Sequence, residues 1–344
     1  MKAAIIERPG VLTVRDIPVP AMGEYDALCE ILYGATCTGT DQHLIAGRFP
    51  WPVSYPTVLG HESIGRVVAV GAKVRHFRPG DLVTRVGTPP SPSGDYNSHF
   101  GGFAEYGIAR DHWAMQADGR PPEEWYGYRW NQVLPADFDP AAATMMITWR
   151  ETLSFLSRLG FVAGATLLVV GSGGNGLSFA AHAVNLGAAR VAMVGNEERA
   201  AAARAVGVAD YYDYRAADWQ EALAHDCGEG FDFIIDAVGK RTTLDDALPY
   251  VKPGGTVAIY GIDEYGAWQL HPARAKGTFT YANYGYDEAE THERVVEFIR
   301  QGRLDARVWL NLDNPFPLEE IGAAFEALRR RELIKALIRV SPHG

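Results

Sequence analysis

Three glycines in the middle of the chain have the spacing of a phosphate-binding loop. Gly171, Gly173 and Gly176 fit the pattern G-x-G-x-x-G, with Gly174 and Asn175 between them. The first glycine permits a tight turn, the second lets the backbone approach a pyrophosphate, and the third allows a helix to pack closely on a strand. An apolar run precedes this loop and a helical segment follows it, which is the context that the motif requires. We therefore expect the five residues to bind a nicotinamide dinucleotide at a helix N-terminus.

The residues after the next predicted strand bear on the choice between NAD and NADP. An NAD site usually has Asp or Glu at this point, which binds the ribose 2′-hydroxyl. Here Gly195 and Asn196 stand there instead, which leaves room for a 2′-phosphate that Arg199 can approach. We therefore favour NADP. Glu197 and Glu198 would repel a phosphate, and one of them could bind the ribose hydroxyls, so NAD stays open.

Strands and helices alternate around the glycine loop. This order predicts an α/β domain with a doubly wound parallel sheet and right-handed crossovers, the Rossmann arrangement. The predicted strands are 167–170, 190–194, 231–235 and 256–260, and the predicted helices are 177–186 and 197–206.

The chain on either side of this region has a different pattern. The part before about residue 150 is rich in glycine and proline, and its short apolar runs predict a compact β-rich domain. The tail after about 280 holds two predicted helices and a last strand. The predicted elements are strands 27–33, 63–70, 82–86 and 335–340 and helices 291–301 and 317–330. The segment 117–132 carries four aromatic residues, and it reads either as a packed surface loop or as an aromatic wall of a substrate cleft.

Composition excludes several classes of protein. A length of 344 residues favours two domains, and a net charge of −10 argues against a nucleic-acid partner. The three cysteines, Cys29, Cys37 and Cys227, cannot form a disulfide framework. The first residues read as a strand rather than a signal peptide, and no window approaches the roughly 20 apolar residues that cross a bilayer. We expect a cytoplasmic protein that binds no membrane.

Seven short segments together resemble the medium-chain dehydrogenase/reductase family, which includes the zinc-containing alcohol, sorbitol and glucose dehydrogenases. They occur in family order across nearly the whole chain. The segments are 39–43 (GTDQH), 60–62 (GHE), 79–83 (PGDLV), 101–106 (GGFAEY), the glycine loop, 236–239 (DAVG) and 252–255 (KPGG).

The resemblance implies a fold and an activity. The β-rich part becomes a GroES-like catalytic domain made of residues 1–150 and 280–344, and residues 151–279 become the Rossmann domain. The implied reaction moves a hydride between a secondary alcohol, or the matching ketone, and NAD(P). Glu62 and the polar residues of the aromatic segment favour a sugar, polyol or cyclitol as substrate. Family members are commonly homodimers or homotetramers, so we expect one of these states.

The family also implies a catalytic zinc ion, and His61, Glu62 and Cys37 are its candidate ligands here. Such a site needs about three protein ligands and one open position. Glu62 has two family precedents, as a ligand or as a carboxylate that orients the ligands. Cys37 is irregular, because the family pattern Cys-Gly-Thr-Asp here reads Cys-Thr-Gly-Thr-Asp. Either one residue is inserted and Cys37 still reaches the metal, or Thr38 takes the ligand position.

Other family positions give further expectations. The place of an additional ligand falls on Ile147, which cannot bind metal, and Glu151 could replace it only if the helix start shifts. Thr40 and His43 match a relay that carries the alcohol proton to solvent, for which a histidine is suited by its pKa near 6.5. Asp41 would be a carboxylate outside the ligand set. The four-cysteine site of a structural zinc is missing, so we expect no second zinc.

Two alternatives stay open. A zinc-free reductase of the same superfamily, acting on a quinone or an activated double bond, is favoured by the displaced Cys37 and by Ile147. It is disfavoured by the retention of the histidine, glutamate and relay residues described above. A non-catalytic protein that keeps the cofactor fold is the third possibility.

Overall fold

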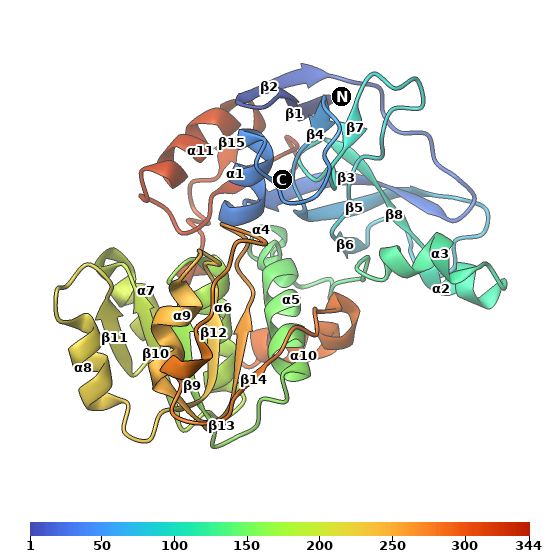
Figure 1. The fold of residues 1–344 in the computed structure, drawn as a ribbon. Helices are drawn as coiled ribbons and strands as arrows, with labels where there is room; N and C mark the ends of the chain where they lie inside the picture. The colour runs from blue at the N-terminus through green and yellow to red at the C-terminus, as the bar shows by residue number, and fades with distance from the viewer. The chain divides into compact units, whose positions relative to one another are not determined.

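The computed structural model describes all residues from 1 to 344, and the chain folds into two compact units (Figure 1). The first unit contains residues 1–147 and 305–344, and the second contains residues 148–304. The sequence-based boundaries lay at 150 and 280. The second boundary lies later than predicted, at 305 instead of 280. The second unit therefore also contains β14 (Thr280–Tyr281) and α10 (His292–Arg300).

The first unit is built on β-sheets. One sheet has the order β15-β16-β3-β5-β6, with β8 paired to β3, and the other has the order β2-β1-β4-β7. The strands are β1 (Lys2–Arg8), β2 (Val11–Asp16), β3 (Asp26–Ala35), β4 (Thr57–Val58), β5 (Glu62–Val70), β6 (Leu82–Thr84), β7 (Asn97–Ser98), β8 (Tyr106–Arg110), β15 (Phe316–Pro317) and β16 (Leu337–Arg339).

The tail of the chain completes the larger of these sheets. Strand β16 pairs antiparallel with β3, with Leu337 opposite Ala35, and β3 pairs on its other edge with β5. Apolar side chains of β3, β5 and β16 share one core cluster with α11 (Ile321–Arg329). The sheet therefore brings together β3, β5 and β16, which are far apart in the sequence. Helix α1 (Thr38–Ala46) begins just after β3 ends, and this point lies beside the start of β5.

The second unit is a parallel six-stranded sheet with the order β11-β10-β9-β12-β13-β14. The order reverses at β9 and β12, as in a doubly wound fold. Strand β9 is a nearly continuous buried apolar run, as expected for a central parallel strand. The other strands are β10 (Arg190–Gly195), β11 (Asp210–Asp213), β12 (Phe231–Asp236) and β13 (Val251–Ile259), and β9 itself is Thr166–Val170.

Helices connect the strands of the second unit. They are α6 (Gly174–Asn185), η2 (Glu197–Arg199), α7 (Ala200–Ala205), α8 (Trp219–Asp226), α9 (Thr243–Ala247), η3 (Leu248–Tyr250), η4 (Pro272–Arg274), η5 (Glu288–Thr291) and α10, and α5 (Met145–Arg158) runs through the first boundary. The first unit has, besides α1 and α11, the short helices α2 (His112–Ala117), α3 (Pro122–Trp125), η1 (Tyr126–Tyr128), α4 (Pro140–Ala143), η6 (Ala306–Val308) and η7 (Leu318–Glu320). These elements confirm the predicted fold class.

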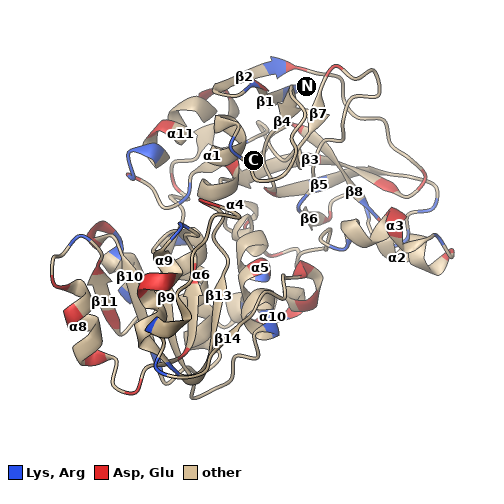
Figure 2. Cartoon of the chain, viewed as in Figure 1, with Lys and Arg blue, Asp and Glu red and all other residues tan.

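The surface carries charges of both signs. Figure 2 shows acidic and basic positions interspersed along both units, in keeping with the net charge of −10. None of the helices is both long and apolar enough to cross a membrane.

Candidate active site

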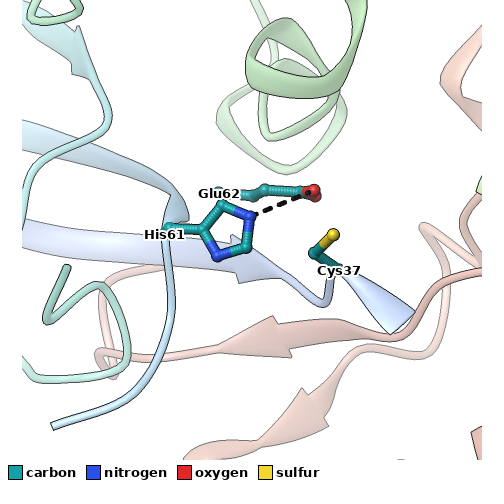
Figure 3. Close-up of side chains that lie close together, drawn as sticks. All are labelled: Cys37, His61 and Glu62. Carbon is teal, nitrogen blue, oxygen red and sulfur yellow. Dashed lines mark ion pairs between the residues drawn. The ribbon is translucent and has the colours of Figure 1, made fainter. Parts of the chain in front are cut away.

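Cys37, His61 and Glu62 form a buried cluster in the first unit (Figure 3). One ligand atom from each side chain lies within 4.8 Å of the others. The cysteine sulfur, the carboxylate and a ring nitrogen all point toward the same space. The structure therefore brings together the three side chains that were predicted from the sequence as candidate zinc ligands.

The local backbone explains how the irregular cysteine reaches this cluster. Cys37 is the N-cap of α1 and has an extended backbone, with φ −96° and ψ 105°. The neighbouring Thr38 directs its hydroxyl to the carbonyl of Ile334, at 3.2 Å. The extra residue is therefore accommodated in the turn between β3 and α1. There the Thr38 hydroxyl donates to the tail of the chain.

His61 enters the cluster from a constrained turn. Gly60, which precedes it, has φ +98°, and a Cβ at this position would lie 2.6 Å from ring atoms of Phe103. Glu62 then begins β5 and is almost completely buried. Gly-His-Glu is therefore a structural unit, because only glycine fits the turn that aims the next two side chains inward.

Asp41 contacts both Cys37 and His61 through its carboxylate. One oxygen of its fully buried carboxylate accepts the backbone N–H of Cys37 at 2.9 Å, and the other lies 3.5 Å from His61 Nδ1. The second ring nitrogen, Nε2, lies 3.9 Å from a Glu62 oxygen. Metal-binding histidines commonly use one nitrogen for the metal and the other toward a carboxylate. The ring orientation fits that arrangement, with Nε2 on the ligand side.

A fourth charged side chain, which the sequence-based prediction missed, lies in this cluster. The ammonium of Lys335 lies 2.8 Å from Glu62 Oε1 and 2.6 Å from Oε2, and both side chains are buried. Lys335 lies two residues before the start of β16 in the tail of the chain. A lysine at the start of an otherwise apolar terminal strand was the available signal, because buried lysines are almost always paired.

The electrostatics show that the cluster attracts positive charge. Burial alone would lower the pKa of His61, but Asp41 and Cys37 outweigh it and raise the pKa to about 10. Burial opposes the charge of Lys335 as well, yet Glu62, Cys37 and Asp41 raise its pKa. Two carboxylates and a cysteine sulfur therefore lie around the His61 ring and the Lys335 ammonium. Sulfur, nitrogen and oxygen donors of this kind fit a divalent metal such as zinc.

The two proposed relay residues both lie on α1. The Nδ1–H of His43 donates to the carbonyl of Gly39 at 2.6 Å, and the ring is buried. This bond places a proton on Nδ1, because a carbonyl oxygen can only accept. Thr40 is half-buried on the same helix. Their relay role stays a prediction.

The alternative ligand position lies in the second unit. The carboxylate of Glu151, on α5, accepts the hydroxyl of Tyr260 at 3.2 Å. Ile147, on the same helix, is buried. Whether Glu151 contacts a metal stays a prediction.

The glycine loop of the second unit has the geometry that its motif requires. Gly171 has φ +108°, in the region that favours glycine, and a Cβ on Gly176 would lie 1.9 Å from the Gly171 carbonyl oxygen. A Cβ on Gly173, in contrast, would have no other atom within 4 Å, and α6 begins at the next residue, Gly174. The first and third glycines are needed for packing, and the second leaves its surroundings open for a ligand.

The end of β10 is more crowded than the sequence suggested. A Cβ on Gly195 would lie 2.4 Å from the Ser172 side chain and 2.4 Å from the Tyr211 hydroxyl. Tyr211 donates to the Asn196 carbonyl at 2.5 Å, and the Asn196 N–H donates to Ser172 Oγ at 3.1 Å. The side-chain amide of Asn196 also donates to the carboxylate of the exposed Glu198, at 3.0 Å. The position that carries an acid in many NAD sites therefore has no space for a side chain unless Ser172 and Tyr211 shift.

Known protein families match both the β-rich first unit and the Rossmann-like second unit. The family described as "Alcohol dehydrogenase GroES-like domain" matches residues 23–119, and the family described as "Zinc-binding dehydrogenase" matches residues 174–299. The chain belongs to the zinc-containing medium-chain dehydrogenase family. It is an NAD(P)-dependent dehydrogenase, as the resemblance implied.

Named relatives of this dehydrogenase act on several alcohols. An alcohol dehydrogenase of Cupriavidus necator is 27% identical, over 100% of this chain and 99% of its own. D-arabinitol dehydrogenase 1 of Uromyces fabae is 25% identical, over 98% of this chain and 97% of its own. A zinc-binding dehydrogenase fold from Sinorhizobium meliloti 1021, solved with NADP bound, superposes with a TM-score of 0.80 at 23% identity, covering 98% of both chains.

A stack of side chains runs from the aromatic segment of the dehydrogenase to His61. The Arg85 guanidinium lies over the rings of Trp130 and Phe100, at 4.8 and 5.0 Å from their centroids. The Phe100 ring lies 5.1 Å from the His61 ring and also packs against His99. The segment 117–132 therefore connects to the metal-ligand candidates through ring contacts within the first unit.

Proposed function

We propose that this dehydrogenase moves a hydride between a secondary alcohol of a polyhydroxy substrate and NADP, with one catalytic zinc ion bound by Cys37, His61 and Glu62. The convergence of these three buried side chains within 4.8 Å supports the metal site. Its sulfur, nitrogen and oxygen donors support a divalent ion such as zinc. A bound zinc would polarise the substrate alcohol and favour loss of its proton.

The protein's own residues supply the remaining steps of the proposed reaction. Asp41 holds the His61 ring and the Cys37 backbone, so both ligands are in place before the metal arrives. Thr40 would accept the alcohol proton as it gives up its own hydroxyl proton, which would pass through the cofactor ribose to His43 for release to solvent. Burial of the cluster excludes bulk water, which strengthens every charge interaction at the reacting carbon.

Three observations support the polyhydroxy substrate and the cofactor preference. Glu62 matches the ligand of sugar and polyol dehydrogenases, and a relative is named for D-arabinitol. The ring stack from Trp130 to His61 supports the interpretation of segment 117–132 as an aromatic wall. The absence of an acid at Gly195, where no side chain fits, supports NADP.

Metal analysis and one substitution test the proposal. We expect about one zinc per chain after purification, and reduced cofactor to form when NADP and polyols are added. His61→Ala should lose the zinc and at least a hundredfold in kcat/KM, with little change in cofactor affinity. Retained turnover without zinc would exclude the proposal, and so would a loss confined to cofactor binding.

A zinc-free reductase is the second candidate, favoured by Ile147 at the position of a family ligand. It predicts a protein that contains no zinc and reduces quinones or activated double bonds at an unchanged rate in chelator. The same metal analysis separates the two candidates.

We further propose that the enzyme is a homodimer or homotetramer and carries no structural zinc. Light scattering coupled to size-exclusion chromatography measures the first property. A zinc content near two per chain would contradict the second.

A further inference from the structure

Lys335 is the one charged residue of the metal cluster to which the proposed reaction gives no role. Its ammonium lies within hydrogen-bonding distance of both Glu62 oxygens, 2.8 and 2.6 Å away. It is 2% exposed, and Glu62 is 1% exposed. Burying such a pair is costly, and a well-packed apolar pair is often at least as stable. Fold stability alone is therefore a weak reason for a lysine here.

The position of the pair relative to the candidate ligands gives a stronger reason. Glu62 is the carboxylate that lies within 4.8 Å of the Cys37 sulfur and the His61 nitrogen. The ammonium therefore holds the same oxygens that a metal would take. A carboxylate on zinc and a carboxylate bonded to an ammonium draw on the same lone pairs, so the two cations compete for it.

We propose that Lys335 is a positioning residue for the metal centre, and that it holds Glu62 and weakens the carboxylate as a metal ligand. This inference rests on the proposed zinc site. A metal centre that acts on a substrate must keep one position open, unlike a structural site with four protein ligands. By holding both Glu62 oxygens, Lys335 keeps the carboxylate from also taking the open position with its second oxygen, and its charge limits the affinity of the cluster for a dication.

Zinc competition with a chromophoric chelator tests the proposal without reference to turnover. Lys335→Met should bind zinc at least tenfold more tightly than the wild type, because the freed carboxylate becomes a full ligand. With cobalt in place of zinc, the visible bands of the variant should lose intensity as the coordination number rises. Lys335→Arg, which keeps the charge and the bonds to Glu62, should return both measurements toward the wild type. Lys73→Met removes an exposed lysine that pairs with Glu24 at 2.7 Å, and it should change neither measurement.

A second pair of variants covers the case in which Lys335→Met does not fold. Glu62→Gln leaves Lys335 without its anion beside the metal, so zinc affinity should fall at least tenfold. Adding Lys335→Met to Glu62→Gln removes that buried cation and should restore most of the lost affinity. A lysine with a purely structural role would leave the double variant no tighter than Glu62→Gln.

The outcomes separate this inference from the proposed function. If the wild type binds one zinc and oxidises alcohols, but Lys335→Met has wild-type affinity and cobalt bands, Lys335 has no positioning role and the function stands. If the wild type binds no zinc, both proposals are wrong.

Discussion

At the scale of single residues, Cys37 shows why a motif with an inserted residue cannot be interpreted from sequence alone. The spacing left Cys37 and Thr38 as rivals for one ligand position. The structure directs the Thr38 hydroxyl to Ile334 and the cysteine sulfur toward His61 and Glu62. The choice depends on the backbone angles at the start of α1, which no local sequence pattern specifies.

This pair of neighbours gives a matched test. Cys37→Ser should lower the zinc content of the purified protein, because a neutral hydroxyl is a poor zinc ligand. Its kcat/KM should fall at least a hundredfold. Thr38→Val should keep both properties, since it removes only a bond to a backbone carbonyl, worth about 1 kcal/mol of stability. Zinc analysis and steady-state kinetics measure the two variants. The reverse pattern would place Thr38 at the metal.

Gly195 gives a second prediction at this scale. An Asp at this position was expected from sequence to favour NAD, yet the structure has no space for its Cβ next to Ser172 and Tyr211. Gly195→Asp should therefore destabilise the protein by about 1–3 kcal/mol and weaken both cofactors. Combining it with Ser172→Gly and Tyr211→Phe removes the obstructing atoms and should shift preference toward NAD. Thermal unfolding and cofactor titration measure these effects, and an NAD-preferring single variant would contradict the crowding.

At the scale of elements, the strands and helices around the glycine loop were largely predictable. The continuous apolar run of β9 and the glycine spacing carry strong signals, and the structure places α6 directly after the loop. The ends of elements were less predictable. The single helix expected at 197–206 is a 3₁₀ turn followed by α7, because the Asn196 side chain accepts the Glu198 N–H and caps the turn first. Lys335 could not be assigned to the site, because strand pairing across the whole chain places it there.

Helix α6 also carries a buried histidine that should make stability depend on pH. His182 is fully buried, and burial lowers its pKa to about 3. The unfolded chain, with a histidine pKa near 6.5, therefore binds a proton between these values that the folded chain does not. Stability should be highest above about pH 6.5 and fall as the pH decreases, by about 2 kcal/mol from this group between pH 7 and pH 5.

The variant His182→Gln should remove this part of the pH dependence, whatever its effect at neutral pH. His225→Gln is the control, because His225 is exposed on α8 of the same unit. Urea unfolding at pH 7 and pH 5 measures the difference in slope. Equal slopes for His182→Gln and the wild type would show that another group titrates.

At the scale of the whole molecule, the two candidate binding regions lie in different units of the chain. The metal cluster is made only of residues of the first unit, and the glycine loop belongs to the second. The sequence predicted this division, because the period of its apolar pattern changes near residue 150. It could not give the point of return at 305, because the helical pattern predicted at 291–301 does not show which unit that helix packs against.

This division predicts how metal removal acts. A chelator should abolish alcohol oxidation and lower the Tm, since a ligand present at 100 times its Kd contributes about 2.7 kcal/mol of stability. The affinity for NADP should change less than threefold. Differential scanning fluorimetry and cofactor titration with and without chelator measure both effects, and added zinc should restore activity. A chelated protein that no longer binds cofactor would show that the two regions depend on each other.

The pairing of β16 with β3 has a consequence for biosynthesis. A ribosome makes Cys37, His61 and Glu62 well before the counter-ion Lys335, which lies 273 residues after Glu62 in the chain. Until then, the nascent chain holds an acidic cluster with no ammonium of its own to balance it. The partly folded chain should therefore bind metal more tightly before β16 pairs with β3 than after Lys335 has reached Glu62.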